Sequence, residues 1–584
     1  MDTEPLIALD PAWPKMTLAE VEAALTAPGA RFEMETITIN GVPTRVWKHA
    51  PPTLAWLAQA SRMHGARLFT IYEDERVTYD ANFRAVATLA GKLQDMGVGK
   101  GDRIALAMRN LPEWPVIFFA AASIGAILVP LNAWWTAGEL EYGIDDSGAA
   151  LLFVDDERYQ RLRAHDAPLP ALERMIVARA ASVLEGPALR LEDLIGTPHD
   201  YATLPEAALP VVELAPDDDA TIFYTSGTTG HPKGALGTHR NLMSNIMTSG
   251  YTAARSLLRR GEALPAAPLP RTTLTVIPLF HVTACSAAMM GSIAAGSSLI
   301  FMRKWDTVRA MEIIEREKVH ITGGVPTVAW QLLEHPDRGN YDLSSLEAIA
   351  YGGAPSAPEL VRRIHSEFGA LPGNGWGMTE TMATVTGHSS EDYLNRPTSA
   401  GPPVPVADLK IMAEDGVTEL AVGEVGELWA RGPMIVKGYW NRPDATRETF
   451  VEGWVRTGDL ARLDEEGFLF VVDRAKDMII RGGENIYSSE VENVLYAHPA
   501  VTDCALIGIP HRTLGEEPAA VVHLAPGMTA TEAELQAWVR ERLAIFKTPV
   551  AVRFVAETLP RNANGKILKK DLKALFEDRV GVAA

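Results

Sequence analysis

Cysteine is scarce in this chain of 584 residues, and the scarcity excludes several kinds of site. Its two cysteines, Cys285 and Cys504, are far apart, and each lies among apolar residues. The chain can therefore build neither a disulfide framework nor a cysteine-based metal site. This usage of cysteine fits a reducing, cytoplasmic setting.

Long uninterrupted apolar runs are also missing. The longest candidate, residues 114–130, is broken by Ser123 and Gly125 and ends in proline, whereas a membrane-spanning helix needs about 20 predominantly apolar residues. We expect no transmembrane segment, and this stretch is predicted to be a buried helix that runs into a strand. The first residues, Met1 to Pro5, show no basic region followed by an apolar core, so no signal peptide is expected.

Positive charge is in deficit, since 54 Lys and Arg stand against 74 Asp and Glu and the formal net charge is −20. Nucleic-acid binding relies on a basic face that neutralises phosphates, so no nucleic-acid partner is expected. Hydrophobic residues make up 47% of the chain and charged residues 22%. Those proportions are typical of a globular protein, and the length indicates more than one domain.

Strand and helix patterns alternate along residues 53–473. The apolar pattern predicts strands at 103–108, 151–155, 274–279, 298–302 and 346–351, and helices at 113–128 and 308–319. Such alternation indicates a layered α/β architecture with mainly parallel sheets. Residues 1–52 form an appendage of unknown role, with a short helix predicted at 18–25 and a hairpin-like alternation over 32–47.

A second, smaller domain is predicted after Asp473. The polar segment 474–477 lies between two apolar runs and is predicted to be a hinge. Residues 478–584 then show a helix at 489–497, strands at 503–509 and 519–524, and a helix at 531–544. This pattern predicts a small α+β domain.

The most informative stretch of the sequence is TSGTTGHPKG, residues 225–234, which follows the short apolar strand pattern of residues 220–224. Backbone N–H groups and hydroxyls of such a run can converge on phosphate oxygens, and a lysine adds positive charge. It differs from a P-loop NTPase because Lys233 is followed by Gly234, where a magnesium-binding Ser or Thr is needed. A flexible linker would have no reason to end in Pro-Lys. The expected phosphate-binding residues are Thr225, Ser226, Gly227, Thr228, Thr229, Gly230 and Lys233.

This stretch resembles the phosphate loop of the acyl-adenylate-forming superfamily, which includes acyl-CoA synthetases, firefly luciferases, 4-coumarate-CoA ligases and the adenylation domains of peptide synthetases. The resemblance spans roughly residues 53–575, with further motifs at 374–380, 454–460, 481–490 and 560–566. It implies an ATP- and Mg²⁺-dependent acid:CoA ligase of the acyl-CoA synthetase branch. It also implies that the C-terminal domain is a mobile lid.

The resemblance assigns a nucleotide site. Trp376 offers a stacking face to adenine, Thr379 can donate to the α-phosphate, and Glu380 is a hard oxygen ligand for Mg²⁺. Asp459 would accept the ribose hydroxyls. The expected nucleotide-binding residues are Gly353, Ala354, Pro355, Asn374, Gly375, Trp376, Thr379, Asp459 and Arg474. Without the flanking motifs, Gly-Trp-Gly would indicate only a tight turn with a core aromatic residue.

The resemblance also assigns the lid. Lys566 matches the lysine that reaches the carboxylate and the α-phosphate during adenylation, and Lys476 occupies the position of the hinge residue. Gly482 and Gly483 lie in the motif that forms the pantetheine tunnel for coenzyme A. The chain departs from the family pattern at several positions. These are Asn374 (commonly glutamine), Trp376 (tyrosine in fatty-acyl members), Ser488 (near a common proline) and Lys569 (commonly arginine).

Selectivity for the acid is expected from two segments, 278–284 and 322–326, together with the ends of neighbouring strands. By resemblance His281 gates the carboxylate, although a core histidine is the alternative. The expected pocket residues are His281, Thr283, Ala284, Gly323, Gly324, Val325, Tyr351, Gly352 and Met378. Small side chains leave volume for a ligand, which favours a fatty acid of medium or long chain or a bulky aryl or steroid acid.

Lys566, His281, Thr379 and Lys233 are therefore the predicted catalytic residues. One alternative function is an adenylating enzyme that delivers its acyl group to a carrier protein. The chain shows no carrier domain after Lys566, which favours a free-standing ligase. Another alternative is a nucleotide-binding regulator without catalysis, against which the intact Lys233, Glu380, Asp459 and Lys566 argue. A homodimer is a family-level expectation.

Overall fold

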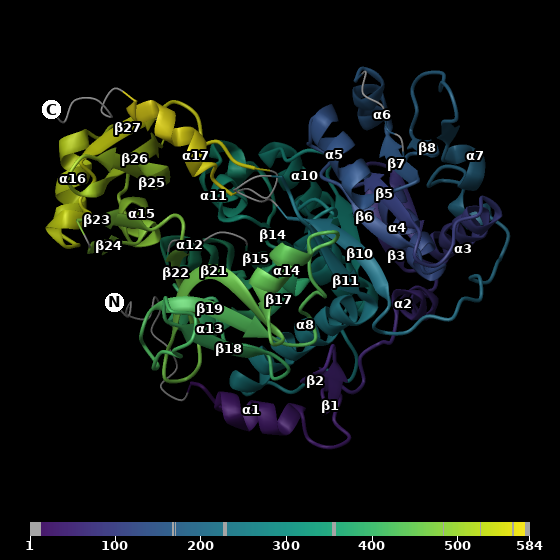
Figure 1. Cartoon of the computed structure of the whole chain (residues 1–584), viewed down its shortest axis with the longest axis horizontal. Helices are drawn as coiled ribbons and strands as arrows, with labels where there is room; N and C mark the ends of the chain where they lie inside the picture. The colour runs from purple at the N-terminus through teal and green to yellow at the C-terminus, as the bar shows by residue number, and fades with distance from the viewer. Residues whose placement is uncertain are drawn as a thin grey trace.

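The computed structural model describes residues 13–165, 169, 171–225, 231–352, 358–482, 484–525, 527–562 and 566–577. Within these residues, a large body built on mainly parallel sheets carries a smaller C-terminal domain at one side (Figure 1). This arrangement confirms the predicted α/β architecture. None of the described helices is both long enough and apolar enough to cross a membrane.

The first large sheet has the strand order β11-β10-β6-β5-β7-β8-β9. Its neighbouring strands are parallel except for β10 and β11, which form an antiparallel hairpin. The strands are β5 (Arg103–Ala107), β6 (Ile127–Pro130), β7 (Leu151–Asp155), β8 (Arg174–Ala178), β9 (Leu189–Arg190), β10 (Asp219–Tyr224) and β11 (Gly234–Thr238).

The second large sheet has the order β17-β16-β15-β14-β12-β13-β3-β4, with parallel central strands and an antiparallel strand at each edge. The strands are β3 (Leu68–Tyr72), β4 (Glu75–Thr78), β12 (Thr272–Thr275), β13 (Ser298–Phe301), β14 (Ile321–Gly324), β15 (Ala348–Tyr351), β16 (Leu371–Met378) and β17 (Ala383–Ser389).

The main core lies between these two sheets. Ile104 and Leu106 of β5 point into it, whereas Ala105 and Ala107 point to the opposite face, as the two-residue period of a strand requires. Helix α4 (Glu113–Ser123) is buried along its whole length. The core is completed by α2 (Leu54–Ser61), α3 (Tyr79–Asp95), α7 (Glu192–Ile195), α8 (His239–Arg259), the π-helix Thr283–Met289 and α9 (Met290–Ala295).

Further helices cover the outer faces of the sheets. The first sheet is covered by α5 (Ala137–Ser147) and α6 (Asp156–Arg163). The second is covered by α10 (Thr307–Glu317), α11 (Pro326–Glu334), α12 (Pro358–Arg363) and α13 (Ser390–Asn395). Short 3-10 or π turns lie at Arg62–His64, Tyr201–Thr203, Pro336–Asn340, Ile364–Phe368 and Thr379–Thr381.

An antiparallel sheet joins the body to the C-terminal domain. Its strands are β18 (Asp408–Met412), β19 (Gly426–Arg431), β21 (Trp454–Leu463) and β20 (Phe450–Val451), in that order, with β22 (Leu469–Arg474) also paired to β21. Helix α14 (Pro443–Thr449) precedes β20. The last strand, β22, runs directly into the predicted hinge.

The N-terminal segment packs on the body. It contains α1 (Leu18–Leu25), begun by a capping box at Thr17, and the hairpin of β1 (Met34–Ile39) and β2 (Val42–Trp47). The rings of Phe32 and Trp47 lie 5.6 Å and 5.5 Å from the ring of Tyr251 on α8. The predicted helix and hairpin are confirmed, and their aromatic residues belong to the same hydrophobic cluster as Trp376.

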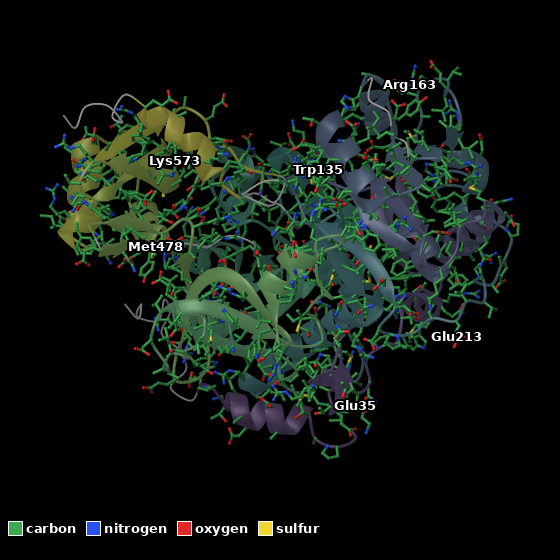
Figure 2. The ribbon with its side chains drawn as sticks, viewed as in Figure 1. Glu35, Trp135, Arg163, Glu213, Met478 and Lys573 are labelled. Atoms are coloured by element: carbon green, nitrogen blue, oxygen red, sulfur yellow. The ribbon has the colours of Figure 1, made fainter. Side chains whose placement is uncertain are left out.

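The C-terminal domain has its own sheet, ordered β24-β23-β26-β25 with β27 paired to β26. Its strands are β23 (Ile479–Arg481), β24 (Glu484–Ile486), β25 (Val501–His511), β26 (Gly515–Leu524) and β27 (Ala551–Val555). Its helices are α15 (Ser488–Tyr496), α16 (Glu532–Arg540) and α17 (Lys569–Leu572), with 3-10 turns at Ile545–Lys547 and Lys573–Phe576. Met478 and Lys573 mark its beginning and its last described turn (Figure 2).

Several predicted boundaries were wrong. The helix predicted at 113–128 ends at Ser123, because Gly125 takes a left-handed φ of 77° and β6 follows. The strand predicted at 274–279 is shifted and ends at Thr275, and the helix predicted at 531–544 ends at Arg540. Apolar residues continue past the end of α4 and past the end of β12, so hydrophobic periodicity alone does not mark these two ends.

Candidate active site

Strands β10 and β11 hold together the two ends of the expected phosphate loop. The Thr225 N–H donates to the Lys233 carbonyl over 2.9 Å, and the Lys233 N–H donates to Thr225 Oγ1 over 3.3 Å. Gly234 must lack a side chain, because an added Cβ would lie 2.5 Å from Ile222 Cγ2. The remaining expected loop residues, Ser226, Gly227, Thr228, Thr229 and Gly230, lie outside the described residues.

Lys233 lies over the ring of Tyr439, with Nζ 4.8 Å from the ring centroid. The Tyr439 hydroxyl donates to Glu380 Oε1 over 2.6 Å. Burial raises the pKa of the Glu380 carboxyl, and the Tyr439 hydroxyl and nearby cations counteract this. The segment that carries Tyr439 is attached to β11, since the Trp440 N–H donates to the Gly234 carbonyl over 2.7 Å. Sequence reasoning missed Tyr439, because no local pattern marks it.

Glu380 suits Mg²⁺ only together with oxygens of a substrate. No group of three or more His, Cys, Asp or Glu side chains within the described part of the chain is placed to hold a metal ion. Mg²⁺ is usually bound through one or two carboxylates and substrate phosphates, and Tyr439 links Glu380 to the expected phosphate-binding Lys233. The carboxylate therefore fits a metal ion that binds together with ATP.

Trp376, Asp459 and Arg474 come from three strands and form one polar group. The Trp376 indole Nε1 donates to Asp459 Oδ2 over 2.8 Å, and Arg474 Nε lies 3.3 Å from Asp459 Oδ1. Asp459 and Arg474 face each other across β21 and β22. Asn374 Oδ1 accepts the Gly375 N–H over 2.7 Å. The structure thus brings together residues that were predicted for the adenine and the ribose.

Glycines of this region are required by the neighbouring strands. An added Cβ at Gly377 would lie 1.5 Å from the Ala383 carbonyl oxygen, and one at Gly323 would lie 1.7 Å from that of Ala350. At Gly375 the nearest carbonyl oxygen would lie 2.6 Å away. The close approach of two backbones excludes a side chain at each position. At Gly323 the missing side chain is therefore explained by β15 without a ligand.

Residues expected to select the acid lie where neighbouring strands end. Gly324 faces Tyr351 across β14 and β15, and the Gly352 N–H donates to the Gly324 carbonyl over 3.2 Å. Tyr351 is buried, and its hydroxyl accepts from the hydroxyl of Tyr393 over 3.0 Å. Val325 and Met378 are both half-buried and lie directly after β14 and at the end of β16.

The segment around His281 leads into the π-helix. His281 is half-buried, and its N–H donates to the Pro278 carbonyl over 3.0 Å. Thr283 is exposed, whereas the side chain of Ala284 is buried in the core between the two large sheets. These two neighbours, predicted to line one pocket, therefore have different surroundings.

Lys566 lies next to the residues predicted to bind ribose. Its ammonium is buried and has no hydrogen-bond partner among the residues that the structure describes. Burial, Arg474 and Lys476 lower the pKa of Lys566 to about 7, and Asp459 is among the groups that counteract this. A buried ammonium without a partner is suited to meet an anionic ligand. Lys566, Lys476 and Asp459 thus share one electrostatic environment.

A set of buried polar contacts connects the end of β22 to the C-terminal domain, beside the predicted hinge. Asp473, at the end of β22, accepts the Ser488 N–H over 2.5 Å and the Ser488 hydroxyl over 2.9 Å. Lys569 Nζ donates to Ser488 Oγ over 2.6 Å and lies 2.8 Å from Glu492 Oε1. Ser488 and Lys569, two positions at which the chain departs from the family pattern, are therefore in contact. A proline at position 488 would lack the N–H that Ser488 donates to Asp473. Lys476 is exposed in the turn that follows β22.

The other expected cofactor residues are placed as follows. Thr379 is half-buried at the start of the turn Thr379–Thr381. Gly482 takes a left-handed φ of 60° after β23, and its N–H donates to the Leu514 carbonyl over 2.7 Å. Gly353, Ala354, Pro355 and Gly483 lie outside the described residues.

A cavity of about 370 Å³ lies where β5, β6, β12 and β13 end, and sequence reasoning did not identify it. Burial and the nearby Arg158 lower the pKa of Arg109 to about 10, and its guanidinium lies 4.8 Å from the ring centroid of Trp134. Basic and aromatic side chains dominate the wall, which consists of Arg109, Asn110, Trp134, Val276, Pro278, Met302, Arg303, Lys304 and Trp305. Such a wall suits an anionic ligand with an aromatic group.

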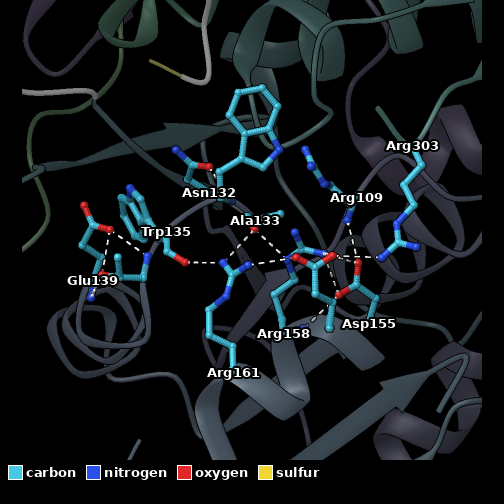
Figure 3. A network of polar contacts seen from close by, with 12 residues as sticks. Arg109, Asn132, Ala133, Trp135, Glu139, Asp155, Arg158, Arg161 and Arg303 are labelled. Atoms are coloured by element: carbon cyan, nitrogen blue, oxygen red, sulfur yellow. Dashed lines mark hydrogen bonds and ion pairs between the residues drawn. The ribbon is translucent and has the colours of Figure 1, made fainter. Parts of the chain in front are cut away.

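A buried ion pair holds the loop that carries Trp134 (Figure 3). Arg158 Nη1 lies 2.9 Å from Asp155 Oδ2, and Arg158 Nε donates to the Ala133 carbonyl over 2.6 Å. Arg161 Nη1 donates to the Trp135 carbonyl over 2.5 Å. These contacts tie the loop after β6 to helix α6, so one wall of the cavity is fixed by buried charge.

Comparisons with known proteins agree with these two domains. A family model described as AMP-binding enzyme matches residues 57–440, and one described as AMP-binding enzyme C-terminal domain matches residues 490–566. Feruloyl-CoA synthase of an Amycolatopsis species is 36% identical over 522 residues, which cover 89% of this chain and 98% of that protein. The long-chain-fatty-acid–CoA ligase FadD13 of Mycobacterium tuberculosis is 35% identical over 533 residues, which cover 90% and 99%.

A solved structure agrees as well. The anthranilate CoA ligase AuaEII in complex with anthranoyl-AMP superposes with a TM-score of 0.81 at 25% identity, covering 91% of this chain and 98% of that one. The anthranoyl-AMP bound in that structure is an acyl-adenylate, the kind of intermediate that the motifs of this sequence imply.

Proposed function

Since the chain belongs to the AMP-binding enzyme family and is an acid–thiol ligase of the acyl-CoA synthetase type, we propose that it activates a hydrophobic carboxylic acid with ATP and transfers the acyl group to coenzyme A. The family membership confirms the resemblance found in the sequence. The observation that carries the proposal is the position of Lys566, whose buried ammonium lies beside Asp459 and Arg474.

In the first half-reaction the carboxylate of the acid attacks the α-phosphorus of ATP, and pyrophosphate leaves. The loop that ends at Lys233 binds the phosphates, and the Trp376–Asp459–Arg474 group binds the nucleoside. Lys566 neutralises charge on the carboxylate and the α-phosphate, which is the main task in a reaction between two anions. Bound at Glu380, Mg²⁺ would supply further neutralisation of phosphate charge.

In the second half-reaction the lid turns about Lys476, and the thiol of coenzyme A attacks the acyl carbonyl, so that acyl-CoA and AMP leave. The residues of a hinge absorb the change in backbone direction, and Lys476 lies at an exposed position in the turn after β22. The cavity around Arg109 and Trp134 supports coenzyme A rather than a carrier protein, because its basic wall complements the nucleotide phosphates that coenzyme A carries.

The acid that we propose is a fatty acid of medium or long chain or a bulky aryl or steroid acid. The relatives named above act, by their names, on ferulic acid, long-chain fatty acids and anthranilate. These acids share an apolar body and a single activated carboxylate. Thr283 and His281 at the start of the π-helix are the residues that we propose for contact with the acid.

The test is a pyrophosphate-release assay over a graded panel of fatty and aryl acids, with coenzyme A present or absent. We expect one class of acid to release pyrophosphate, and coenzyme A to accelerate AMP release and give a thioester. Release of AMP that coenzyme A does not accelerate would favour delivery to a carrier protein. Absence of pyrophosphate release with every acid, despite ATP binding, would favour a non-catalytic regulator.

A Lys566→Ala variant separates the half-reactions. It should lose nearly all adenylate formation, because the charge at the reacting centre is gone, and it should keep thioester formation from presynthesised adenylate. The exposed Lys573 on the same domain supplies the matched control, Lys573→Ala. Equal loss of both half-reactions in Lys566→Ala would contradict the role assigned to Lys566.

A further inference from the structure

Helix α5 contacts His231 and Pro232, near the C-terminal end of the expected phosphate loop, through an aromatic side chain. The ring of Tyr142 stacks on the imidazole of His231, with 4.6 Å between the ring centroids and 23° between the planes. The Tyr142 hydroxyl donates to the Pro232 carbonyl over 2.9 Å. Both contacts fall on the two residues that directly precede Lys233.

A second side chain of the same helix face, Asp146, joins the segments on either side. The Tyr224 hydroxyl donates to Asp146 Oδ2 over 2.8 Å, so the end of β10 is bound to α5. Arg442 Nη2 lies 2.5 Å from Asp146 Oδ1 and donates to the Tyr142 hydroxyl over 3.3 Å. Arg442 also lies three residues after Tyr439 in the chain, and Tyr439 is the ring beneath the Lys233 ammonium.

The position of helix α5 is itself fixed by its cap and by its packing. A capping box begins it, in which the Thr136 N–H donates to Glu139 Oε2 over 2.7 Å. On its buried face Gly143 packs so tightly that an added Cβ would lie 2.8 Å from Leu131 and 2.9 Å from Trp135. A fixed helix that binds both Tyr224 and Pro232 can set the direction of Lys233, the residue that follows Pro232.

We propose that Tyr142 is a positioning residue for adenylation, which sets the direction of Lys233 by fixing His231 and Pro232. The inference rests on the proposed function, in which Lys233 binds ATP phosphates. Tyr142 acts by its ring, which stacks on His231, and by its hydroxyl, which holds the Pro232 carbonyl. Loss of either contact frees the backbone that leads to Lys233.

Two substitutions separate the ring from the hydroxyl. Tyr142→Phe keeps the stack and loses the hydrogen bond to the Pro232 carbonyl together with the longer one from Arg442. We expect kcat/KM for ATP in adenylation to fall about fivefold, the equivalent of the one shorter hydrogen bond, which holds Pro232. Tyr142→Leu loses both contacts, and we expect a fall of about 30-fold or more. In both variants thioester formation from presynthesised adenylate should match the wild type, because Lys233 has no part in that step.

The matched control is Tyr159→Phe on the neighbouring helix α6. The Tyr159 hydroxyl accepts the Glu185 N–H over 2.9 Å, so this variant also deletes one hydroxyl contact of a tyrosine that packs on the same sheet. Adenylation by Tyr159→Phe should equal that of the wild type. Thermal unfolding of all variants measures whether loss of activity follows loss of fold.

The outcomes are distinct. Adenylation unchanged in Tyr142→Leu would overturn the inference, and so would equal losses in the two half-reactions or a loss matched by Tyr159→Phe. If Tyr142→Leu fails to fold, the Tyr142→Phe result decides alone: a fivefold loss confined to adenylation supports the inference, and no loss overturns it. Failure of the proposed function appears separately, as absence of ATP–pyrophosphate exchange in the wild type.

Discussion

The protonation of Lys566 should be coupled to ATP binding, and the coupling can be measured. Because the pKa of Lys566 is lowered to about 7 in the ligand-free protein, roughly one molecule in ten carries the ammonium at pH 8. The phosphates of ATP favour the charged form. Binding at pH 8 should therefore take up roughly 0.9 proton at this residue, whereas at pH 6 the uptake should be roughly 0.1, since most molecules are protonated already.

The assay is titration calorimetry with a non-cleavable ATP analogue, repeated in buffers of different ionisation enthalpy. Other groups and the analogue itself also exchange protons, so the quantity that counts is the difference between the wild type and Lys566→Met. This difference should be near 0.9 at pH 8 and small at pH 6. The Lys573→Met variant should show no difference from the wild type. Equal uptake in the wild type and Lys566→Met at pH 8 would refute the reasoning.

Other variants should respond as follows. Lys233→Ala should raise KM for ATP at least tenfold and slow adenylation, since it removes the cation that is expected to bind the phosphates. Unchanged kinetics would contradict the role of Lys233 in phosphate binding. Ser488→Pro removes the donors to Asp473, so it should slow adenylation relative to thioester formation, as stopped-flow of each half-reaction would show. Lys304→Ala should raise KM for coenzyme A about threefold to tenfold but leave KM for pantetheine unchanged, because pantetheine lacks the nucleotide phosphates; equal effects would exclude the cavity as the nucleotide site. Burial lowers the pKa of His388 to about 3, so the unfolded chain binds a proton that the native histidine does not. The free energy of unfolding should therefore decrease as the pH falls from about 6.5 to about 3. In urea titrations this decrease should be smaller for the His388→Gln variant than for the wild type.

Local patterns in the sequence predicted many of the elements. Strand β7 was predicted with its observed bounds, because a short apolar run is bounded by polar residues on its C-terminal side. The helix at 113–128 was predicted too long, since the apolar character continues through Gly125 into β6. Only the left-handed backbone at Gly125, which the fold imposes, separates helix from strand.

The candidate active site also contains residues that the sequence predicted and residues that it did not. Trp376, Asp459, Arg474 and Lys566 were expected from motifs, and the structure places the first three in one polar group with Lys566 beside it. Tyr439 was missed, because its role comes from a contact with β11, more than two hundred residues earlier in the chain. Such contacts leave no periodic signal in the sequence.

The cavity was missed for a similar reason. Its wall combines Arg109, Trp134 and Lys304 from the ends of separate strands in two sheets. Each of these residues alone has the pattern of an ordinary surface residue. The glycine at position 323 was interpreted as room for a ligand, whereas the β15 backbone already accounts for it.

The N-terminal segment has a consequence for anyone who recombines relatives of this enzyme. Phe32 and Trp47 pack on Tyr251 of α8, and all three rings belong to the hydrophobic cluster that contains Trp376. A chimera joined at residue 53 would inherit α8 without the partners that its Tyr251 packs on. A fusion point before α1 would preserve this packing. Residues 13–52 should therefore be exchanged together with the large N-terminal body, as one unit.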